Sequence, residues 1–274
     1  MRKDSTKLEV LISTCNERIL IALDVLLPVD PRVRYILVHQ IFDEFDSEKS
    51  FQYVENALKS RDDVLYIRSE TKGLSVSRNI ALSNSTAEYV LFADDDIQYL
   101  PDAIDIVLKA FEELPDADVL TFRFHNGQGK HRKAYPGSIM RRTYRNLFSV
   151  SSVEVALKRD AQVASAAYFD ERFGLGAAFP VAEENIFLSD LYSAGKKIYF
   201  YPADLLIHPD ETSGGNWGDT HLKARGALFK RVFSWYGLPL LLIFLGKHHN
   251  KISAQAGRLW GFKVAVTSFF RFKK

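Results

Sequence analysis

The sequence predicts an α/β fold in which helices cover both faces of a mostly parallel sheet and a helical region follows at the C-terminus. Four short apolar runs rich in β-branched residues lie in the first hundred residues, at 8–13, 35–40, 64–68 and 89–93. Runs of this length and composition are typical of buried strands, and helix-like stretches separate them. Alternation of strands and helices along a chain favours a parallel sheet.

The helices between these strands are expected where apolar residues recur at helical spacing, over residues 17–27, 47–60 and 74–82. Pro28 ends the first of them. After the fourth strand, Pro101 and Asp102 suit a first helical turn, because proline needs no hydrogen-bond partner there and a carboxylate favours the positive end of a helix. This helix is predicted to end near residue 113.

The second half of the chain has a less regular pattern. Strands are predicted at 119–124, 198–201 and 205–207, and a helix at 183–194 that ends at Gly195. Two segments are expected to be loops because they are rich in glycine and polar residues, 125–146 and 209–220, the second of them mobile.

The composition is that of a folded globular protein. The 274 residues are 47% hydrophobic and 26% charged, without repeats or low-complexity tracts. The single cysteine, Cys15, excludes an intramolecular disulfide, and no signal-like segment opens the sequence. We therefore expect a cytoplasmic protein with a main domain over residues 1–218 and an appended region over 219–274.

The appended region has a distinct charge and composition. Residues 219–274 hold eleven Lys or Arg and one acidic residue, whereas the rest of the chain has a net charge of −8. Aromatic residues lie among these cations, which indicates an anionic membrane surface on the inner face of the cell membrane. The uncharged stretch 232–246 has 15 residues and contains Pro239, whereas a span needs roughly 20 apolar residues. We expect this region to lie on the membrane.

The basic region has two other interpretations. An ordinary helical lid could pack its apolar side on the main domain. Nucleic acid is not expected as a partner, because aliphatic residues fill the basic stretch and no nucleic-acid-binding motif is present.

Three adjacent carboxylates, Asp94, Asp95 and Asp96, directly follow the predicted strand at 89–93. They repel one another unless a cation is near, and Mg²⁺ and Mn²⁺ take oxygen ligands that they often share with substrate phosphates. The sequence therefore predicts a divalent metal site, with a solvated acidic turn as the alternative.

The order of several motifs resembles family 2 of the inverting glycosyltransferases, of the type found in bacterial cell-surface polysaccharide synthesis. The motifs are Ser13-Thr14-Cys15-Asn16-Glu17, Gly73-Leu74-Ser75-Val76-Ser77-Arg78-Asn79, Asp94-Asp95-Asp96, Glu183-Glu184 and His208. The resemblance runs from about residue 7 to 218 and implies the GT-A fold, the Rossmann-like fold of nucleotide-diphospho-sugar transferases. It further implies a nucleotide-sugar donor, with UDP as the expected nucleotide, and a glycan or lipid-linked acceptor.

The resemblance assigns most of these residues to the donor. Thr14, Asn16 and Glu17 would line the nucleoside pocket, Arg78 and Asn79 would reach toward the donor or the sheet end, and Asp94 and Asp95 would approach the ribose and the sugar. Asp96 would bind Mn²⁺ or Mg²⁺, with His208 as a second ligand or a diphosphate contact. The alternatives are a surface ion pair for Arg78, helix caps for Thr14 and Asn16, and an ordinary hydrogen bond for His208.

The catalytic base is expected in the pair Glu183 and Glu184. In the family an acidic pair opens a helix that ends in an Ala-Gly turn, and counting back from Gly195 favours Glu184. The family pair is normally Glu then Asp, so the choice between the two stays open. One carboxylate suffices to remove a proton from the acceptor hydroxyl. A preference for acids in a first helical turn is the alternative.

One segment departs from the family pattern. Members commonly have an Asp-Gly-Ser type turn after the second strand, whereas this chain has His39-Gln40-Ile41-Phe42-Asp43. Two other functions fit the sequence less well. A nucleotidyltransferase would need a Gly-rich phosphate loop that residues 8–20 lack, and a catalytically inactive protein that binds membrane or carbohydrate would leave the intact acidic residues unexplained.

Overall fold

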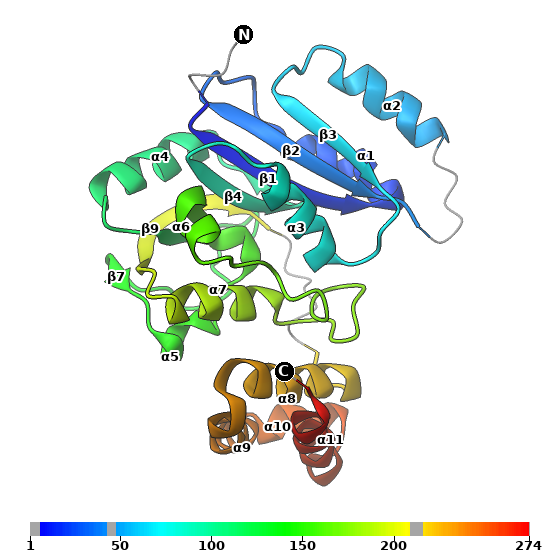
Figure 1. Cartoon of the computed structure of the whole chain (residues 1–274), viewed down its shortest axis with the longest axis vertical. Helices are drawn as coiled ribbons and strands as arrows, with labels where there is room; N and C mark the ends of the chain where they lie inside the picture. The colour runs from blue at the N-terminus through cyan, green and yellow to red at the C-terminus, as the bar shows by residue number, and fades with distance from the viewer. Residues whose placement is uncertain (1–5, 43–47, 209–215, 274) are drawn as a thin grey trace. The chain divides into compact units, whose positions relative to one another are not determined.

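The computed structural model describes residues 6–42, 48–208 and 216–273 (Figure 1). The chain divides into two compact units. Unit 1 consists of Met1–Lys72, Val76–Tyr168 and Leu191–Asp210, and unit 2 consists of Gly73–Ser75, Phe169–Asp190 and Glu211–Lys274.

Unit 1 is built on a nine-stranded sheet. Its strands lie in the order β3 (Val64–Ser69), β2 (Val33–Gln40), β1 (Leu8–Cys15), β4 (Tyr89–Asp94), β8 (Val155–Lys158), β6 (Val119–His125), β9 (Ile198–Ile207) and β5 (Gln98–Tyr99), and β7 (Met140–Arg141) pairs with β9. The first four strands are parallel, as predicted. The other half is mixed, because β8 runs antiparallel to both β4 and β6.

The register of the parallel strands aligns their carboxyl ends. Ser13 on β1 lies opposite Asp94 on β4, and Cys15 lies opposite Gln40 on β2. The polar residues that follow these three strands therefore meet at one edge of the sheet, where ligands of open α/β sheets bind.

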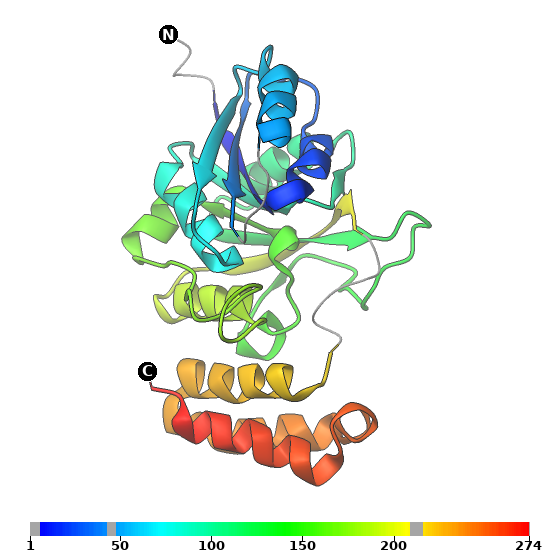
Figure 2. The ribbon, with the colours of Figure 1, turned by 90° about the vertical axis from the view of Figure 1, so that its right-hand side faces the viewer.

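The helices α1 (Ile19–Ala22), α2 (Glu48–Leu58) and α4 (Ala103–Glu113) share one hydrophobic core with the sheet. Alternate residues of β1, Leu8, Val10 and Ile12, are fully buried in it, as a strand with period two requires. Helix α3 (Leu74–Asn84) lies on the opposite face (Figures 1 and 2). The predicted helix at 17–27 is shorter than expected, because the backbone is already extended at Leu26.

The second half of unit 1 differs more from the predictions. The strands predicted at 198–201 and 205–207 form one continuous strand, β9, and the sequence did not predict β8 or helix α6 (Arg159–Ala164). The predicted loop at 125–146 contains β7 and the start of α5 (Tyr144–Leu147). The helix predicted at 183–194 is α7 (Glu183–Ser193). Of the loop predicted at 209–220, residues 209–215 lie outside the described residues, and Asp219 begins the next helix.

The C-terminal part of unit 2 is helical, as predicted. It contains α8 (Asp219–Phe233), α9 (Gly237–Lys247), α10 (His249–Gln255) and α11 (Arg258–Arg271). These helices have their own core, which includes Trp217, Leu222, Phe229, Leu241, Leu245, Ile252 and Phe269. Helices α8 and α11 approach so closely that a Cβ on Gly226 would lie 2.0 Å from the Ala265 carbonyl oxygen.

By length and hydropathy alone, the stretch Asp219–Lys247 could cross a membrane. The backbone breaks within it, because Ser234 adopts a φ of 53° between α8 and α9. A Cβ on Gly237 would lie 2.2 Å from the Phe229 carbonyl oxygen, so α9 begins packed directly on the end of α8. The stretch is therefore two helices that fold back on each other (Figure 2), and not one straight span.

Candidate active site

Asp95 is the most enclosed carboxylate of the acidic triplet, with 8% of its side chain exposed. The Thr14 hydroxyl donates a hydrogen bond of 2.8 Å to it, and Nε of Arg18 donates to both carboxylate oxygens at 2.9 and 3.0 Å. Burial raises the pKa of Asp95, and the bonds from Arg18 and Thr14 oppose that rise. Thr14 thus joins the end of β1 to the triplet and is not a helix cap.

Arg18 is a site residue that the sequence did not single out. It follows the polar segment after β1 within the turn Asn16–Arg18, and its guanidinium also donates to Asp96 at 3.1 Å. The same guanidinium therefore bridges two of the three carboxylates and reduces their mutual repulsion. Its position directly after the 13–17 motif is the one signal that could have drawn attention to it.

Asp94 is bound by an arginine of helix α3, which lies on the face of the sheet opposite to α1, α2 and α4. Arg78, on α3, donates to Asp94 at 2.7 Å and to the Ser152 hydroxyl at 2.7 Å, and its side chain is 1% exposed. The alternative of a surface ion pair for Arg78 is therefore wrong. A fully buried guanidinium needs such partners, because an uncompensated charge in the interior is very costly. Asn79, the next residue of α3, is half-buried.

Asp96 and His208 face one another at the open side of the triplet. Nε2 of His208 lies 3.8 Å from Oδ1 of Asp96, and 35% of the Asp96 side chain is exposed. Ligands of an octahedral Mg²⁺ at about 2.0–2.1 Å lie about 2.9 Å apart when adjacent and about 4.1 Å apart when opposite. The 3.8 Å separation lies between these values, so a small shift of either side chain would let both groups bind one ion.

This pair would be only part of a coordination shell. Among the described residues, no group of three or more His, Cys, Asp or Glu is arranged to hold a metal ion. Asp96 and His208 would therefore supply two ligands, and oxygens of a bound diphosphate and water would supply the others, as is usual for Mg²⁺ sites that bind nucleotides.

Asn16 and His39 tie the ends of β1 and β2 together. The Asn16 side chain accepts a hydrogen bond of 3.1 Å from the Phe42 amide, so Asn16 does not cap a helix, and its backbone has a φ of 46°. Nε2 of His39 lies 2.9 Å from the Asn16 carbonyl oxygen and Nδ1 lies 2.7 Å from the Tyr66 hydroxyl. Because a carbonyl only accepts, Nε2 carries the proton and Nδ1 accepts from Tyr66. Burial lowers the pKa of His39, which keeps the ring neutral.

The segment after β2 therefore has a structural role in this chain. Where the family pattern has a carboxylate turn, His39 binds the Asn16 carbonyl oxygen and the Phe42 amide binds the Asn16 side chain. Glu17, the next residue, is exposed on the turn beside them.

The acidic pair belongs to unit 2 and opens helix α7. Glu183 is 7% exposed, and a Cβ on the neighbouring Gly174 would lie 3.4 Å from its carboxyl carbon, whereas Glu184 is only half-buried. Ala182, directly before the pair, has a φ of 83°. Strained non-glycine residues of this kind gather at functional sites. Of the two carboxylates, Glu184 is the more accessible to a substrate.

A family model described as Glycosyl transferase family 2 matches residues 10–161, more than half of the chain. The chain belongs to this family. The matched residues include most of β1, all of β2 to β4 and the acidic triplet, whereas the acidic pair and His208 lie beyond them.

Solved structures similar to this family 2 glycosyltransferase agree on its fold. The crystal structure of residues 1–349 of S. aureus TarS has a TM-score of 0.69 and 15% identity, covering 97% of this chain and 80% of TarS 1–349. The structure of the same protein in complex with UDP-GlcNAc has a TM-score of 0.63 and 16% identity, and the match covers 97% of this chain and 81% of that one. The mannosyltransferase PcManGT from Pyrobaculum calidifontis, in complex with GDP-Man and Mn²⁺, has a TM-score of 0.58 and 15% identity, and the match covers 97% of this chain and 75% of that one. The predicted GT-A fold is confirmed. No curated protein sequence matches the chain.

Proposed function

We propose that this glycosyltransferase is a metal-dependent, inverting hexosyltransferase that moves a sugar from a nucleotide diphosphate, most simply a UDP-sugar, to a glycan or lipid-linked acceptor at an anionic membrane surface. The synthesis of a cell-surface polysaccharide is the process that this reaction would serve. The observation that carries the proposal is the acidic triplet at the end of β4, in which Asp94 and Asp95 are held by arginines while Asp96 faces His208.

The donor would lie along the edge formed by the ends of β1, β2 and β4. The nucleoside would contact the segment Thr14, Asn16 and Glu17, and the ribose and sugar would lie near Asp94 and Asp95. Arg78, which holds Asp94, and Asn79 would reach toward the donor from α3. The structures of similar proteins with UDP-GlcNAc and with GDP-Man make both nucleotides suitable candidates for the first tests.

Asp96 and His208 are proposed to hold Mn²⁺ or Mg²⁺ on the donor diphosphate. The bound ion would stabilise the negative charge that develops on the leaving nucleotide diphosphate. The carboxylate of Asp96 already lies beside the cationic Arg18, whose guanidinium would have to leave Asp96 for a metal ion to bind there. The structure of the similar protein PcManGT contains GDP-Man together with Mn²⁺, which supports a divalent metal ion on the donor.

Glu184 is proposed as the general base. Its carboxylate takes the proton from an acceptor hydroxyl while that oxygen forms a bond to the anomeric carbon of the donor sugar. The bond from the anomeric carbon to the diphosphate oxygen breaks in the same step, and its electron pair leaves with the diphosphate. A single displacement of this kind inverts the configuration of the sugar.

The C-terminal region is proposed to dock on the cytoplasmic face of the cell membrane. Helices α8 to α11 bury one apolar side in their own core but leave large apolar residues exposed, among them Trp235 at 62%, Tyr236 at 84% and Ile243 at 69%. Exposed aromatic and aliphatic side chains among lysines and arginines are typical of a surface that lies in the lipid interface. We keep residues 1–218 as the transferase domain and 219–274 as the membrane-facing region.

A donor panel tests the proposal. The full chain is incubated with each common nucleotide sugar and Mn²⁺ or Mg²⁺, and release of the free nucleotide is followed with and without EDTA. Consumption of one donor, abolished by EDTA, is the expected result. Consumption that EDTA leaves unchanged would contradict the metal role, and a chain that binds donors without turnover would favour the inactive, binding alternative.

A further inference from the structure

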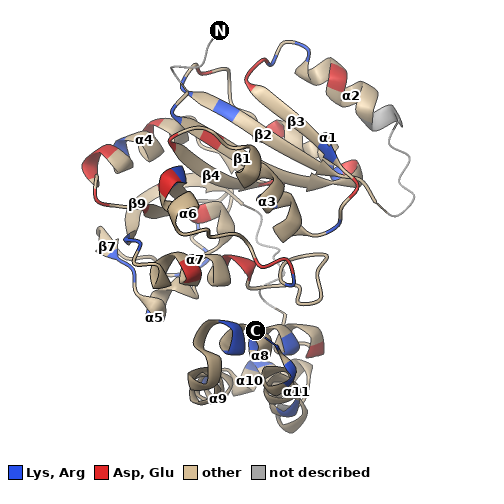
Figure 3. Cartoon of the chain, viewed as in Figure 1, with Lys and Arg blue, Asp and Glu red and all other residues tan. Residues whose placement is uncertain are grey.

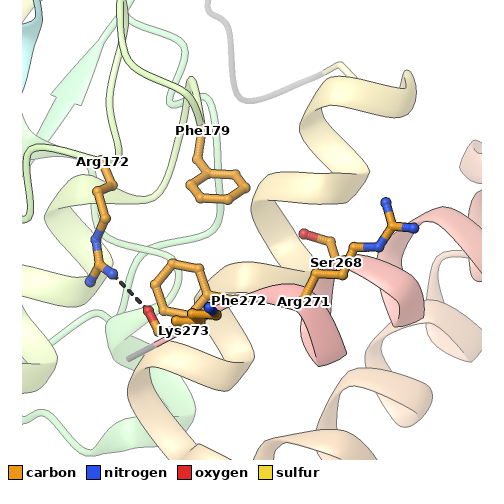
Figure 4. Close-up of a pocket in the computed structure, with 6 residues that line it drawn as sticks. All are labelled: Arg172, Phe179, Ser268, Arg271, Phe272 and Lys273. Carbon is orange, nitrogen blue, oxygen red and sulfur yellow. Dashed lines mark hydrogen bonds between the residues drawn. The ribbon is translucent and has the colours of Figure 1, made fainter.

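Unit 2 contains a cavity of about 320 Å³ that the proposed chemistry does not use. It is lined by Arg172 and Phe179 from the segment before the acidic pair and by Ser268, Arg271, Phe272 and Lys273 from the end of α11 and the residues after it (Figure 4). Small-molecule sites have volumes of about 300–1,000 Å³, so this cavity suits a small group such as a headgroup.

The charge of the lining is entirely positive. Arg172, Arg271 and Lys273 line the cavity, and no acidic side chain does. Arg172 pairs with Asp170 at 2.6 Å, whereas Arg271 and Lys273 have no ion-pair partner in the part of the chain that the structure describes. Two cations without an ion-pair partner at one cavity favour an anionic ligand, and arginine suits phosphate because its donors match the phosphate oxygens.

The cavity also has an apolar wall, formed by phenylalanines. Phe179 and Phe272 lie with ring centroids 5.7 Å apart, and the fully buried Phe173 lies 4.9 Å from Phe179 and 5.7 Å from Phe272. Figure 4 shows Arg172 on one side of the Phe179 and Phe272 rings and Ser268 with Arg271 on the other. A ligand in this cavity would therefore meet phenyl rings and cations together.

The wall is fixed in place before any ligand binds. The Arg172 guanidinium lies 4.5 Å from the centre of the Phe272 ring and donates to the Lys273 carbonyl oxygen at 2.8 Å. Asp170 orients Arg172 through two further hydrogen bonds and also accepts one from Arg231 of α8. A site whose side chains are already oriented loses less entropy when a ligand binds.

We propose that this cavity binds a phosphate group attached to an apolar chain. Arg271 and Lys273 would bind the phosphate oxygens, and Phe179 and Phe272 would contact the first carbons of the chain. Two sources share this chemistry, the phosphate of a lipid-linked acceptor and the headgroup phosphate of a bilayer lipid.

The lipid-linked acceptor as a source of the phosphate rests on the proposed function, and the position of the cavity within unit 2 supports it. Phe173 of the apolar wall is followed by Gly174, whose Cβ position lies 3.4 Å from the carboxyl carbon of Glu183. The segment that carries Phe173 therefore packs against the first residue of the acidic pair that opens α7. An acceptor held by its phosphate would therefore be fixed to the same unit as the proposed base.

Calorimetry with soluble probes tests the inference directly. The full chain is titrated with hexyl phosphate, with hexanol and with inorganic phosphate, and the double variant Arg271→Gln/Lys273→Gln is compared with Lys263→Gln, an exposed lysine of α11 outside the cavity. We expect hexyl phosphate to bind best, and the double variant to weaken it about tenfold or more while Lys263→Gln leaves it unchanged. Melting temperatures check that each variant is folded.

Two results of the titrations would overturn the inference. One is the lack of saturable hexyl phosphate binding, and the other is equal affinity in the wild type and the double variant. Equal affinity for hexyl phosphate and inorganic phosphate would also contradict it, because the phenyl rings would then contribute nothing.

Vesicles distinguish the two sources of the phosphate. The double variant and a charge-matched double variant, Lys251→Gln/Lys263→Gln, are sedimented with phosphatidylglycerol vesicles. A larger loss for the cavity variant identifies the bilayer lipid, and equal losses identify the acceptor. The wild-type chain separates this inference from the proposed function: hexyl phosphate binding without turnover of any donor would refute the transferase proposal and leave the phosphate site standing.

Discussion

The edge of the sheet and the C-terminal helices differ in whether their charged side chains have ion-pair partners. At the sheet edge, Asp94 is paired with a buried arginine and Asp95 with Arg18, so the charges are mostly satisfied within the protein. On the C-terminal helices, Lys247, Lys251 and Lys263 have no ion-pair partner among the described residues, and lysines and arginines predominate there (Figure 3). Paired charges fix the geometry that a reaction needs, whereas unpaired charges remain available to attract an external anionic surface.

The largest expected effect is at the open end of the triplet. Asp96→Ala removes the carboxylate that faces His208, and we expect metal-dependent turnover of the donor to fall about a thousandfold or more, since a metal on the diphosphate contributes several kcal/mol to catalysis. Steady-state rates with the donor chosen from the panel measure the loss. Asp116→Ala, at an exposed aspartate that pairs with Lys197, is the matched control and should retain the wild-type rate. A variant at Asp96 with a near-normal rate would remove the metal role.

The next effect distinguishes the two carboxylates of the acidic pair. Glu184→Gln keeps the shape of the side chain but removes the base, so we expect turnover to fall about a hundredfold to a thousandfold with donor affinity unchanged. Glu183→Gln should retain more activity, because that side chain is buried beside Gly174. Single-turnover rates and donor affinities measured for both variants show which carboxylate is the base. If Glu183→Gln is the inactive variant, the base is Glu183.

The strands around the site could be predicted because each is a continuous apolar run that ends in polar residues. The strands β1 to β4 lie within two residues of their predicted bounds. Strand β8 was missed because four residues inserted antiparallel between β4 and β6 leave no periodic pattern. Strand β9 was divided into two because Pro202 resembles a turn, although it lies within one continuous strand.

The site was predicted where chemistry follows directly from sequence position, and missed where it depends on distant contacts. Asp94 to Asp96 directly follow a strand, so their location at the sheet edge could be foreseen. Arg18 is 77 positions from Asp95, and only the tight turn after β1 brings them together. The bond from His39 to the Asn16 backbone likewise depends on the pairing of β1 with β2.

A smaller effect concerns the exposed aromatics of the C-terminal helices. Tyr236 is 84% exposed, and removing its ring with Tyr236→Ser should lower the affinity for phosphatidylglycerol vesicles several-fold, because about 1–2 kcal/mol of apolar burial in the lipid interface is lost. Tyr53→Ser, at a 49% exposed tyrosine of α2 in unit 1, is the matched control. Co-sedimentation over a range of lipid concentrations gives both affinities. Equal vesicle binding by Tyr236→Ser and the wild type would place the membrane contact elsewhere.

The smallest expected effect is the pH dependence of stability at His39. Burial lowers the pKa of His39 in the folded protein, so the unfolded chain binds the extra proton first as the pH falls below about 6.5. The free energy of unfolding should therefore decrease toward acid, by at most about 1.4 kcal/mol per pH unit from this group. His39→Gln retains a donor for the Asn16 carbonyl and removes the titration, so urea unfolding at pH 5.5 and 7 should show a smaller difference than in the wild type. Because burial also lowers the pKa of His248 in unit 2, a residual slope is expected in the variant. An unchanged slope would mean that the ring accepts a proton without cost, and that the sheet edge around Asn16 is less rigidly fixed than its hydrogen bonds indicate.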